Sequence, residues 1–446
     1  MTTSAQETPT TTVPTTDLDA VKLGLVERYQ QVRRFTEQLC EPLVTEDYVI
    51  QSMPDVSPTK WHIAHVSWFF ETFLLTWADP DYPSYHPRFA YLFNSYYNAV
   101  GPRHCRPKRG LISRPTVKET YEYRQYVDQH MLALLDRLDG PRLLEAAPRV
   151  TLGLHHEQQH QELMLMDIKH VFSQNPLYPV YAAHEPVPVA TVPTLEWVPF
   201  SEGVSWIGHE GPGYSFDSFA FDNEGPRHRE FLQPFRLASR LTTNGDYLRF
   251  MADGGYERPE FWLSDGWYAI QNQGWKAPLY WEQQDGNWWE MTLNGLHTVN
   301  PAEPVCHVSY YEADAFARWA GARLPTEAEW EVASEGMPIS GNFAESGRYH
   351  PAPLIDAATA TSGEGTLKQM FGDVWVWTQS SYAPYPGYHP APGALGEYNG
   401  KFMCDQYVLR GGCCATSQSH LRRTYRNFFP ASARWPFTGI RLANDA

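Results

Sequence analysis

A short run of histidine, amide and carboxylate residues carries the side chains best suited to metal chemistry. Residues 154–162 have the sequence LHHEQQHQE. On a helix each residue turns by about 100°, so His156 and His160 lie only about 40° apart, one turn above the other. Two imidazoles placed in this way can bind one divalent metal ion. His155 and Glu162 point away from that face by the same geometry. A third ligand must therefore come from another helix.

A second pair of histidines, His62 and His65, lies in the segment WHIAH. The two are three residues apart and near one face of a predicted helix, so either could supply the third ligand, and spacing does not separate them. The interior of a helical bundle is a common place for such a site. Three imidazoles without a carboxylate leave coordination positions open for substrate and oxygen. We therefore predict a metal site shared by two helices.

The helices that must carry these histidines are indicated by apolar residues at three- and four-residue steps. Ser57 and Pro58 are typical of a helix start, as an N-cap followed by proline at the first helical position. Four helices joined by loops predict an up-and-down bundle over residues 17–175. The first is expected from Asp17 onward, the second from Ser57, the third over 116–138, and the fourth after Pro148 to about Phe172.

The rest of the chain has a different character. Residues 1–16 are rich in Thr, Pro and Ser and contain no apolar segment, which predicts a disordered tail rather than a signal peptide. Prolines recur through residues 176–194, which favours an extended linker. Over 195–446 Gly and Trp are frequent, and helical periodicity is limited to 311–320 and 326–333. We expect an α+β domain there.

The charge and cysteine content exclude several classes of function. Thirty-five basic and 51 acidic residues give a formal charge of −16, which disfavours nucleic acid and anionic membranes as partners. No stretch is long and apolar enough to predict a membrane span. The six cysteines include no CxxC pair, so neither a dense disulfide framework nor a thiolate zinc site is expected. These features predict a cytoplasmic protein.

Motifs in both predicted domains resemble one enzyme family. SPTKWHIAH (57–65) and the HxxxHxE run (156–162) resemble the DinB-like domain of sulfoxide synthases. The C-terminal part resembles the formylglycine-generating-enzyme-like domain, a variant of the C-type lectin fold. Its markers are RLPTEAEWE (323–331), FGDVWVWT (371–378), LRGG (409–412) and TGIR (438–441). The two domains in this order resemble the EgtB-type sulfoxide synthases of ergothioneine biosynthesis.

The resemblance implies a non-haem iron(II) enzyme that uses O2. Such enzymes join the sulfur of a donor to the imidazole C2 of hercynine (Nα-trimethylhistidine) and oxidise the sulfur to a sulfoxide. Family ligands map onto His65, His156 and His160, which favours His65 over His62. Gln159 matches a residue near the hercynine imidazole. Asn427 and Phe428 match a stretch that contacts hercynine, whose trimethylammonium group suits aromatic surroundings.

The resemblance also implies how the thiol is handled. A nearby acid would divert the reaction from cysteine sulfinic acid toward carbon–sulfur bond formation, and a tyrosine hydroxyl can serve. Tyr97 is the first candidate, together with Tyr96, and Tyr398 is the second choice. Arg103 and Arg106 match arginines that hold the carboxylate of the sulfur donor, a role that suits the guanidinium group.

Two departures from the family pattern bear on the substrate. Members that use γ-glutamylcysteine carry an acidic residue where Phe429 aligns, so its absence favours free cysteine. Formylglycine-generating enzymes have a Cys-x4-Cys pair where this chain has Thr416 and Leu421, so copper–thiol chemistry is not expected. The alternatives are the same reaction with γ-glutamylcysteine, an ovothiol-type reaction with histidine, a DinB-type zinc-dependent thiol transferase, and a lectin-like ligand-binding protein.

Overall fold

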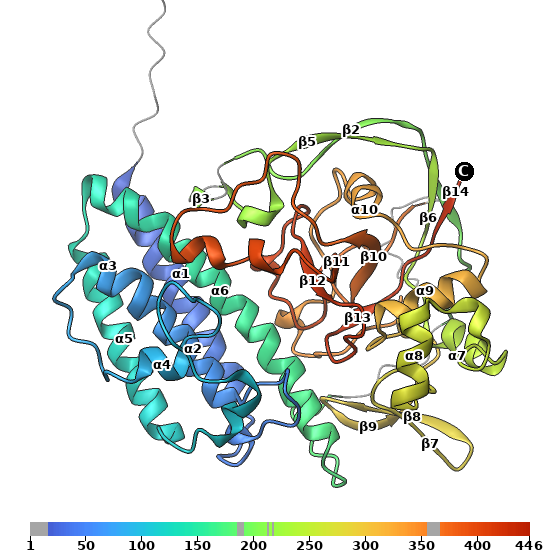
Figure 1. Cartoon of the computed structure of the whole chain (residues 1–446), viewed down its shortest axis with the longest axis horizontal. Helices are drawn as coiled ribbons and strands as arrows, with labels where there is room; N and C mark the ends of the chain where they lie inside the picture. The colour runs from blue at the N-terminus through green and yellow to red at the C-terminus, as the bar shows by residue number, and fades with distance from the viewer. Residues whose placement is uncertain (1–16, 185–190, 212–213, 216–217, 355–365) are drawn as a thin grey trace, which may run out of the picture.

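Four long helices form the N-terminal half of the protein (Figure 1). The computed structural model describes residues 17–184, 191–211, 214–215, 218–354 and 366–446; the predicted tail 1–16 and part of the predicted linker lie outside these ranges. The long helices are α1 (Leu18–Cys40), α2 (Thr59–Phe70), α5 (Val117–Arg137) and α6 (Gly140–Ser173). The predicted four-helix bundle is confirmed. Within the described ranges, no helix has both the length and the apolar character that crossing a membrane requires.

Shorter helical segments connect the long ones. A π-helical turn (Glu71–Leu75) and α3 (Thr76–Ala78) continue α2, and α4 is Phe89–Phe93. Two 3-10 turns span Asp47–Val49 and Arg106–Leu111. The sequence predicted that Ser57 caps the second helix, and this prediction is wrong. The Ser57 N–H donates to Asp167 Oδ2 at 2.8 Å, and no side chain caps α2, because a tertiary contact replaces the local one.

The predicted start of the fourth helix after Pro148 is wrong. Helix α6 begins at Gly140, has Pro141 in its first turn, and continues through Pro148 without ending. Proline at an interior position removes one hydrogen bond of the helix. The flanking residues Ala146, Ala147 and Val150 are buried in the bundle core, and this packing holds the helix together across the proline.

The C-terminal half is an α+β domain of small sheets and short helices, as expected. A four-stranded sheet has the order β12-β11-β10-β13, and three-stranded sheets have the orders β1-β6-β14 and β7-β8-β9. Two-stranded ribbons pair β2 with β5 and β3 with β4. The strands are β1 (Trp197–Phe200), β2 (Gly203–Ile207), β3 (Tyr214–Ser215), β4 (Ser218–Phe219), β5 (His228–Leu232), β6 (Phe235–Ala238), β7 (Trp281–Gln284), β8 (Asn287–Thr292), β9 (Gly295–Thr298), β10 (Trp375–Ser381), β11 (Gln406–Arg410), β12 (Asn427–Pro430), β13 (Thr438–Gly439) and β14 (Ala443–Asp445).

Two of the helices in this domain were predicted and two were missed. Helices α9 (Tyr310–Trp319) and α10 (Glu327–Ala333) match the predicted ranges. Helices α7 (Asn244–Ala252) and α8 (Ser264–Gln273) were not expected. Each has only a short run of periodic apolar residues and contains a glycine in its first turn. The start of α7 nevertheless has a readable signal, because Thr243 and Asp246 form a capping box.

Helix α6 also forms the boundary between the two domains (Figure 1). Glu162 on this helix accepts hydrogen bonds from Trp375 Nε1 at 2.7 Å and Thr416 Oγ1 at 2.6 Å, both from the C-terminal domain. Further along, Lys169 Nζ lies 2.8 Å from His307 Nε2. These side chains are buried. Helix α6 therefore makes buried hydrogen bonds to the C-terminal domain and contributes apolar side chains to the core of the helical bundle.

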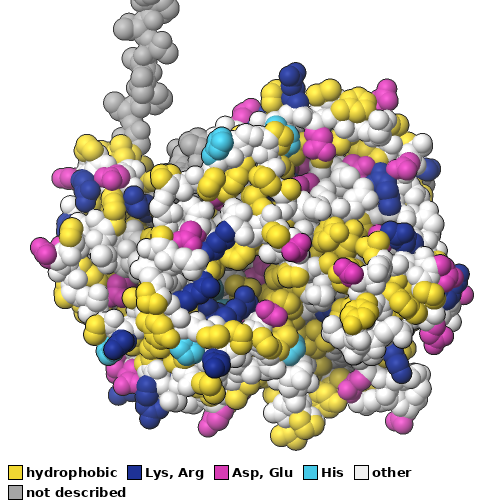
Figure 2. All heavy atoms as spheres, in the orientation of Figure 1, with side chains coloured by type: hydrophobic (Ala, Val, Ile, Leu, Met, Phe, Trp, Pro, Cys, Tyr) yellow, Lys and Arg dark blue, Asp and Glu magenta, His cyan; other side chains and the backbone are white. Residues whose placement is uncertain are grey.

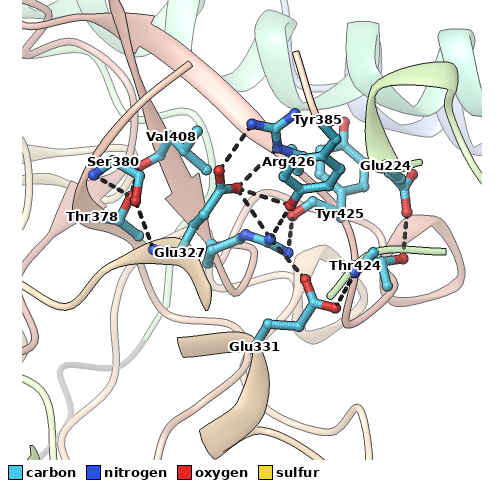
Figure 3. Close-up of polar contacts among 12 residues, drawn as sticks. Glu224, Glu327, Glu331, Thr378, Ser380, Tyr385, Val408, Thr424, Tyr425 and Arg426 are labelled. Atoms are coloured by element: carbon cyan, nitrogen blue, oxygen red, sulfur yellow. Dashed lines mark hydrogen bonds and ion pairs between the residues drawn. The ribbon is translucent and has the colours of Figure 1, made fainter. Parts of the chain in front are cut away.

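A buried network of charges supports strand β12 (Figure 3). Glu327, at the start of α10, receives two hydrogen bonds from Arg426, each at 2.9 Å. The Arg410 guanidinium lies 2.9 Å from Glu331 and 3.2 Å from Glu327. Two-point pairing of this kind fixes both distance and orientation. The network therefore sets the position of the residues that follow Arg426 in β12.

Candidate metal centre

Three histidines from two helices of the bundle converge in its interior. His65 comes from α2, and His156 and His160 come from α6; one nitrogen atom of each lies within 4.8 Å of the other two. The Nε2 atoms of His65 and His156 are 3.2 Å apart. This spacing matches two ligands on one ion with metal–nitrogen bonds of about 2.1 Å. The three rings are 0–8% exposed, so the cluster lies inside the protein.

The three imidazoles are poised as neutral ligands. Burial is the main cause that lowers their pKa values, and neighbouring histidines add to the effect for His65 and His160. The pKa of His156 falls to about 3. At neutral pH each ring therefore keeps an unprotonated nitrogen. Neutral imidazole is the form that binds divalent iron, zinc or copper.

Hydrogen bonds behind the cluster fix the orientation of the rings. His65 Nδ1 donates to the carbonyl oxygen of Phe93 at 2.6 Å, which leaves its Nε2 toward the cluster. His62 Nε2 donates to Asp167 Oδ2 at 3.0 Å, so His62 Nδ1 accepts from His160 Nδ1 at 2.8 Å. Partners of this kind set the tautomer of a metal-binding histidine. His62 thus supports the cluster from behind rather than joining it.

His155 and Glu162 face the C-terminal domain, away from the face of His156 and His160 as the helical geometry predicts. His155 Nδ1 lies 2.9 Å from His420 Nδ1, and its ring stacks on Phe219 at 4.0 Å. Glu162 makes the contacts to Trp375 and Thr416 described above. Thr416 stands at one of the two Cys-x4-Cys positions, and its hydroxyl is used in this contact rather than in thiol chemistry.

The two adjacent tyrosines lie on a loop beside the histidine rings. Asn94 holds this loop by donating to the carbonyls of Tyr97 at 2.9 Å and Gly101 at 3.2 Å. Tyr97 is fully buried, and its ring centroid lies 5.7 Å from that of Trp68, which stacks on His65. The hydroxyl oxygens of Tyr96 and Tyr97 are 3.5 Å apart.

The C-terminal domain fixes the tyrosine loop from outside. Glu397 accepts from the backbone N–H groups of Asn98 at 3.0 Å and Ala99 at 2.7 Å. Lys401 pairs with Glu397 at 2.7 Å and donates to the Tyr96 carbonyl. The loop therefore depends on residues that lie about three hundred positions further along the chain. Sequence reasoning missed Glu397 and Lys401, whose i, i+4 spacing is their only local signal.

Gln159 links α6, the helix of His156 and His160, to two tyrosines of the C-terminal domain. Its amide nitrogen donates to Tyr425 Oη at 2.7 Å, and its amide oxygen accepts from the Tyr398 hydroxyl. The Tyr398 ring lies edge-on to His156 at 5.7 Å. Both ends of the amide are engaged, so Gln159 has a fixed orientation one residue before His160.

The basic loop separates into exposed and buried arginines. Arg103 and Arg106 are exposed, and Arg106 donates to the Asp55 carbonyl at 2.6 Å. Arg109 is 3% exposed, and its guanidinium carbon lies 3.3 Å from the ring centroid of Trp61, which stacks on His65 at 4.6 Å. Figure 2 shows Lys and Arg side chains gathered beside a hollow near the boundary of the domains.

Arg109 has no carboxylate within hydrogen-bond distance in the part of the chain that the structure describes. Its NH1 and NH2 donate to the hydroxyls of Ser57 at 2.9 Å and Ser95 at 3.3 Å, and its Nε has no hydrogen-bond partner in the described residues. Burial and the nearby Arg106 lower its pKa. A buried guanidinium without a counter-ion is costly and is suited to receive an anion.

The β12 residues divide between the two faces of their strand. The Phe428 ring stacks on Tyr382 at 4.1 Å and lies 5.9 Å from Phe402, which contacts Tyr96. Phe429 points to the other face and packs edge-on against Trp435 at 5.6 Å. Asn427 Oδ1 accepts from the backbone N–H of Phe428 at 2.9 Å. The strand thus brings Phe428 toward the tyrosine loop.

The comparisons with known proteins cover both domains. Residues 28–164 match the DinB superfamily, and residues 202–446 match the sulfatase-modifying factor enzyme 1-like domain. The chain is 33% identical over 417 residues to hercynine oxygenase from Mycolicibacterium thermoresistibile, a match that covers 88% of each chain. The chain belongs to the hercynine oxygenase family. Hercynine oxygenase from Mycolicibacterium smegmatis is 31% identical over 422 residues, covering 89% of this chain and 92% of the relative.

Membership of the hercynine oxygenase family accounts for the order of the two domains. A formylglycine-generating enzyme from Streptomyces coelicolor is 29% identical over 274 residues, but that match covers only 52% of this chain. The hercynine oxygenases instead match across the bundle and the α+β domain together. The predicted architecture and family are confirmed.

Proposed function

We propose that this protein is an iron(II)-dependent sulfoxide synthase that joins cysteine to hercynine. One O2 is consumed for each product: hercynine C2 loses its hydrogen, the cysteine thiol loses its hydrogen, and a carbon–sulfur bond forms. One oxygen atom becomes the sulfoxide oxygen and the other leaves as water, so the four electrons taken from the substrates balance the reduction of O2. The observation that carries the proposal is the buried cluster of His65, His156 and His160 in a member of the hercynine oxygenase family.

The residues present fit a ferrous ion. Three neutral imidazoles at ligand spacing would hold it and leave positions for a thiolate and for oxygen. Bound there, iron(II) would supply activation of O2 and bring the reacting groups together. The pairs His65–Phe93 and His62–Asp167 would keep the ligand nitrogens aimed at the ion. Burial keeps bulk water from the cluster.

The basic loop would hold the cysteine carboxylate. Arg109 is a buried cation that stacks on Trp61 beside His65, and among the described residues its hydrogen bonds go to hydroxyls rather than to a carboxylate. Arg103 and Arg106 remain candidates at the exposed side of the same loop. Phe429 stands where relatives that use γ-glutamylcysteine carry an acid, and here it packs on Trp435. This supports free cysteine as the donor.

The tyrosine pair would supply the proton that diverts the reaction from thiol oxidation. Tyr97 is buried beside the rings that stack on His65 and His156, and Tyr96 is 3.5 Å from it. The Tyr398 hydroxyl donates a hydrogen bond to the amide oxygen of Gln159, so this hydroxyl serves to orient that amide. Gln159 would then meet the hercynine imidazole, and Phe428 would face the trimethylammonium group.

The test is aerobic incubation of the full chain with iron(II), cysteine and hercynine, followed by mass spectrometry. Hercynyl-cysteine sulfoxide is the expected product. Cysteine sulfinate alone would indicate a thiol dioxygenase, and turnover with zinc in the absence of O2 would indicate a thiol transferase. Parallel reactions with γ-glutamylcysteine and with histidine decide the substrates. A higher kcat/KM for either alternative would overturn the assignment of that substrate.

A further inference from the structure

A second group of possible metal ligands lies in the C-terminal domain. Glu290 is on strand β8, Glu303 is in the loop after β9, and His350 follows the 3-10 turn Ala344–Ser346. Their candidate ligand atoms all lie within 4.8 Å of one another. His350 Nε2 is 3.1 Å from Glu303 Oε2 and 3.5 Å from Glu290 Oε1. Three segments far apart in sequence therefore meet at one point.

The group lines a cavity that has room for an ion. The cavity has a volume of about 310 Å³, and its other polar lining residues include His184, His297 and Asn300. His297 is paired with Glu290 across the β8–β9 ladder. The carboxylates of Glu290 and Glu303 are buried, at 5% and 7% exposure. The carboxylate and imidazole groups on its lining are ligands that a divalent cation can use.

The charges in the group are unbalanced. Two buried carboxylates share one imidazole, and within the described residues Glu290 has no hydrogen-bond donor closer than His350 at 3.5 Å. Buried carboxylates are normally paired or bound to metal. A divalent ion bound between Glu290, Glu303 and His350 would neutralise both carboxylates.

We propose that Glu290, Glu303 and His350 form a second metal site that binds a divalent transition-metal ion such as Zn²⁺. The 3.1 and 3.5 Å spacings match ligands on an ion with bonds of about 2.0–2.2 Å. One imidazole with two carboxylates suits Zn²⁺ or Mn²⁺, whereas Ca²⁺ takes six to eight oxygens. The ion would tie the β8–β9 hairpin to the segment around residue 350. This role is structural and independent of the proposed reaction.

The experiment counts metal ions in the full chain after iron loading. Protein that already holds iron(II) at the histidine cluster is incubated anaerobically with micromolar Zn²⁺, desalted and analysed for both metals. Wild type should retain one zinc per chain, and Glu290→Gln and Glu303→Gln should each reduce it at least tenfold. Exposed Glu257 provides the matched control Glu257→Gln, which should retain the zinc. Zinc should also raise the melting temperature of wild type by roughly 2–4 °C.

The outcomes separate this site from the histidine cluster. His156→Ala should lose the iron and keep the second-site zinc, whereas Glu290→Gln should lose the zinc and keep both the iron and product formation within about twofold. Equal zinc in wild type and both glutamate variants would overturn the proposal. Retention of Ca²⁺ as tight as that of Zn²⁺ would overturn the role of His350 as a nitrogen ligand. Failure of the proposed reaction would leave these metal counts unchanged.

Discussion

His62 accepts a hydrogen bond from His160 and donates one to Asp167, so a carboxylate 3.0 Å from one ring fixes the next ring in the metal cluster. Asp167 also binds the backbone N–H of Ser57 at the start of α2. The two helices that supply the ligands are thus joined directly behind the site. The relationship predicts that affinity for the proposed iron depends on Asp167, a residue outside the histidine cluster.

Replacement of Asp167 by alanine should weaken iron binding by about 10–100-fold, because loss of an outer partner frees the ligand ring. The measurement is an anaerobic titration of apo-protein with iron(II). Asp139 is exposed and makes no capping hydrogen bond, so Asp139→Ala is the control. Unchanged affinity in Asp167→Ala would show that His160 is held by other contacts.

Tyr97→Phe should shift the product ratio toward cysteine sulfinate while iron binding is preserved. The change removes one buried hydroxyl and should cost about 1 kcal/mol of stability. Tyr96→Phe should have a smaller effect on the ratio, and Tyr398→Phe should mainly raise the KM for hercynine because it releases Gln159. Quantitative mass spectrometry of both products measures the ratio. An unaltered ratio in Tyr97→Phe assigns the proton to another residue.

Arg109→Gln should raise the KM for cysteine by about 10–100-fold, the equivalent of a lost charge-assisted hydrogen bond of roughly 1.5–3 kcal/mol. Arg103→Gln and Arg106→Gln are matched controls on the same loop, and their exposure predicts smaller effects. Steady-state kinetics at saturating hercynine give the comparison. A larger effect at Arg103 than at Arg109 would contradict the placement of the carboxylate.

Glu327→Gln should destabilise the protein by about 3 kcal/mol at pH 7, because Arg410 and Arg426 would remain buried without their shared carboxylate. Burial opposes ionisation of Glu327, but Arg426 and Arg410 hold its pKa below the usual value. The contribution is therefore present above the pKa of about 4.3 in the unfolded chain and is lost as pH falls through the lower folded pKa.

Thermal unfolding from pH 7 to pH 3 measures this contribution. The melting temperatures of wild type and Glu327→Gln should converge toward the acid end of the range. Glu260, which is exposed and pairs with Arg258 at the surface, supplies the control Glu260→Gln. A constant difference between wild type and Glu327→Gln across the range would show that packing, not charge, accounts for the loss.

The sequence was sufficient for the features that depend on local periodicity or on short motifs. Helical spacing placed His156 and His160 on one face and turned His155 and Glu162 to another, and the structure has both arrangements. The choice between His62 and His65 required tertiary geometry, because both lie on the same face of α2. Resemblance favoured His65, and the hydrogen bond of His62 to Asp167 gives the physical reason.

Features that depend on distant contacts could not be predicted from spacing. Pro148 indicated a helix start, but packing of its neighbours carries α6 past it. Arg109 differs from Arg103 and Arg106 only in burial, which depends on the fold of the loop around Trp61. Glu397 acts on a loop of the other domain, and nothing near it in the sequence points there.

The division of the centre between the two ends of the chain has a consequence for biosynthesis. The three clustered histidines are complete once α6 has been translated, whereas Tyr398, Tyr425 and Glu397, which cover and brace them, emerge from the ribosome much later. A ferrous ion captured by the nascent bundle would face solvent and oxygen without those partners. Delaying iron loading until the last strands have docked would protect the growing polypeptide from oxidative damage.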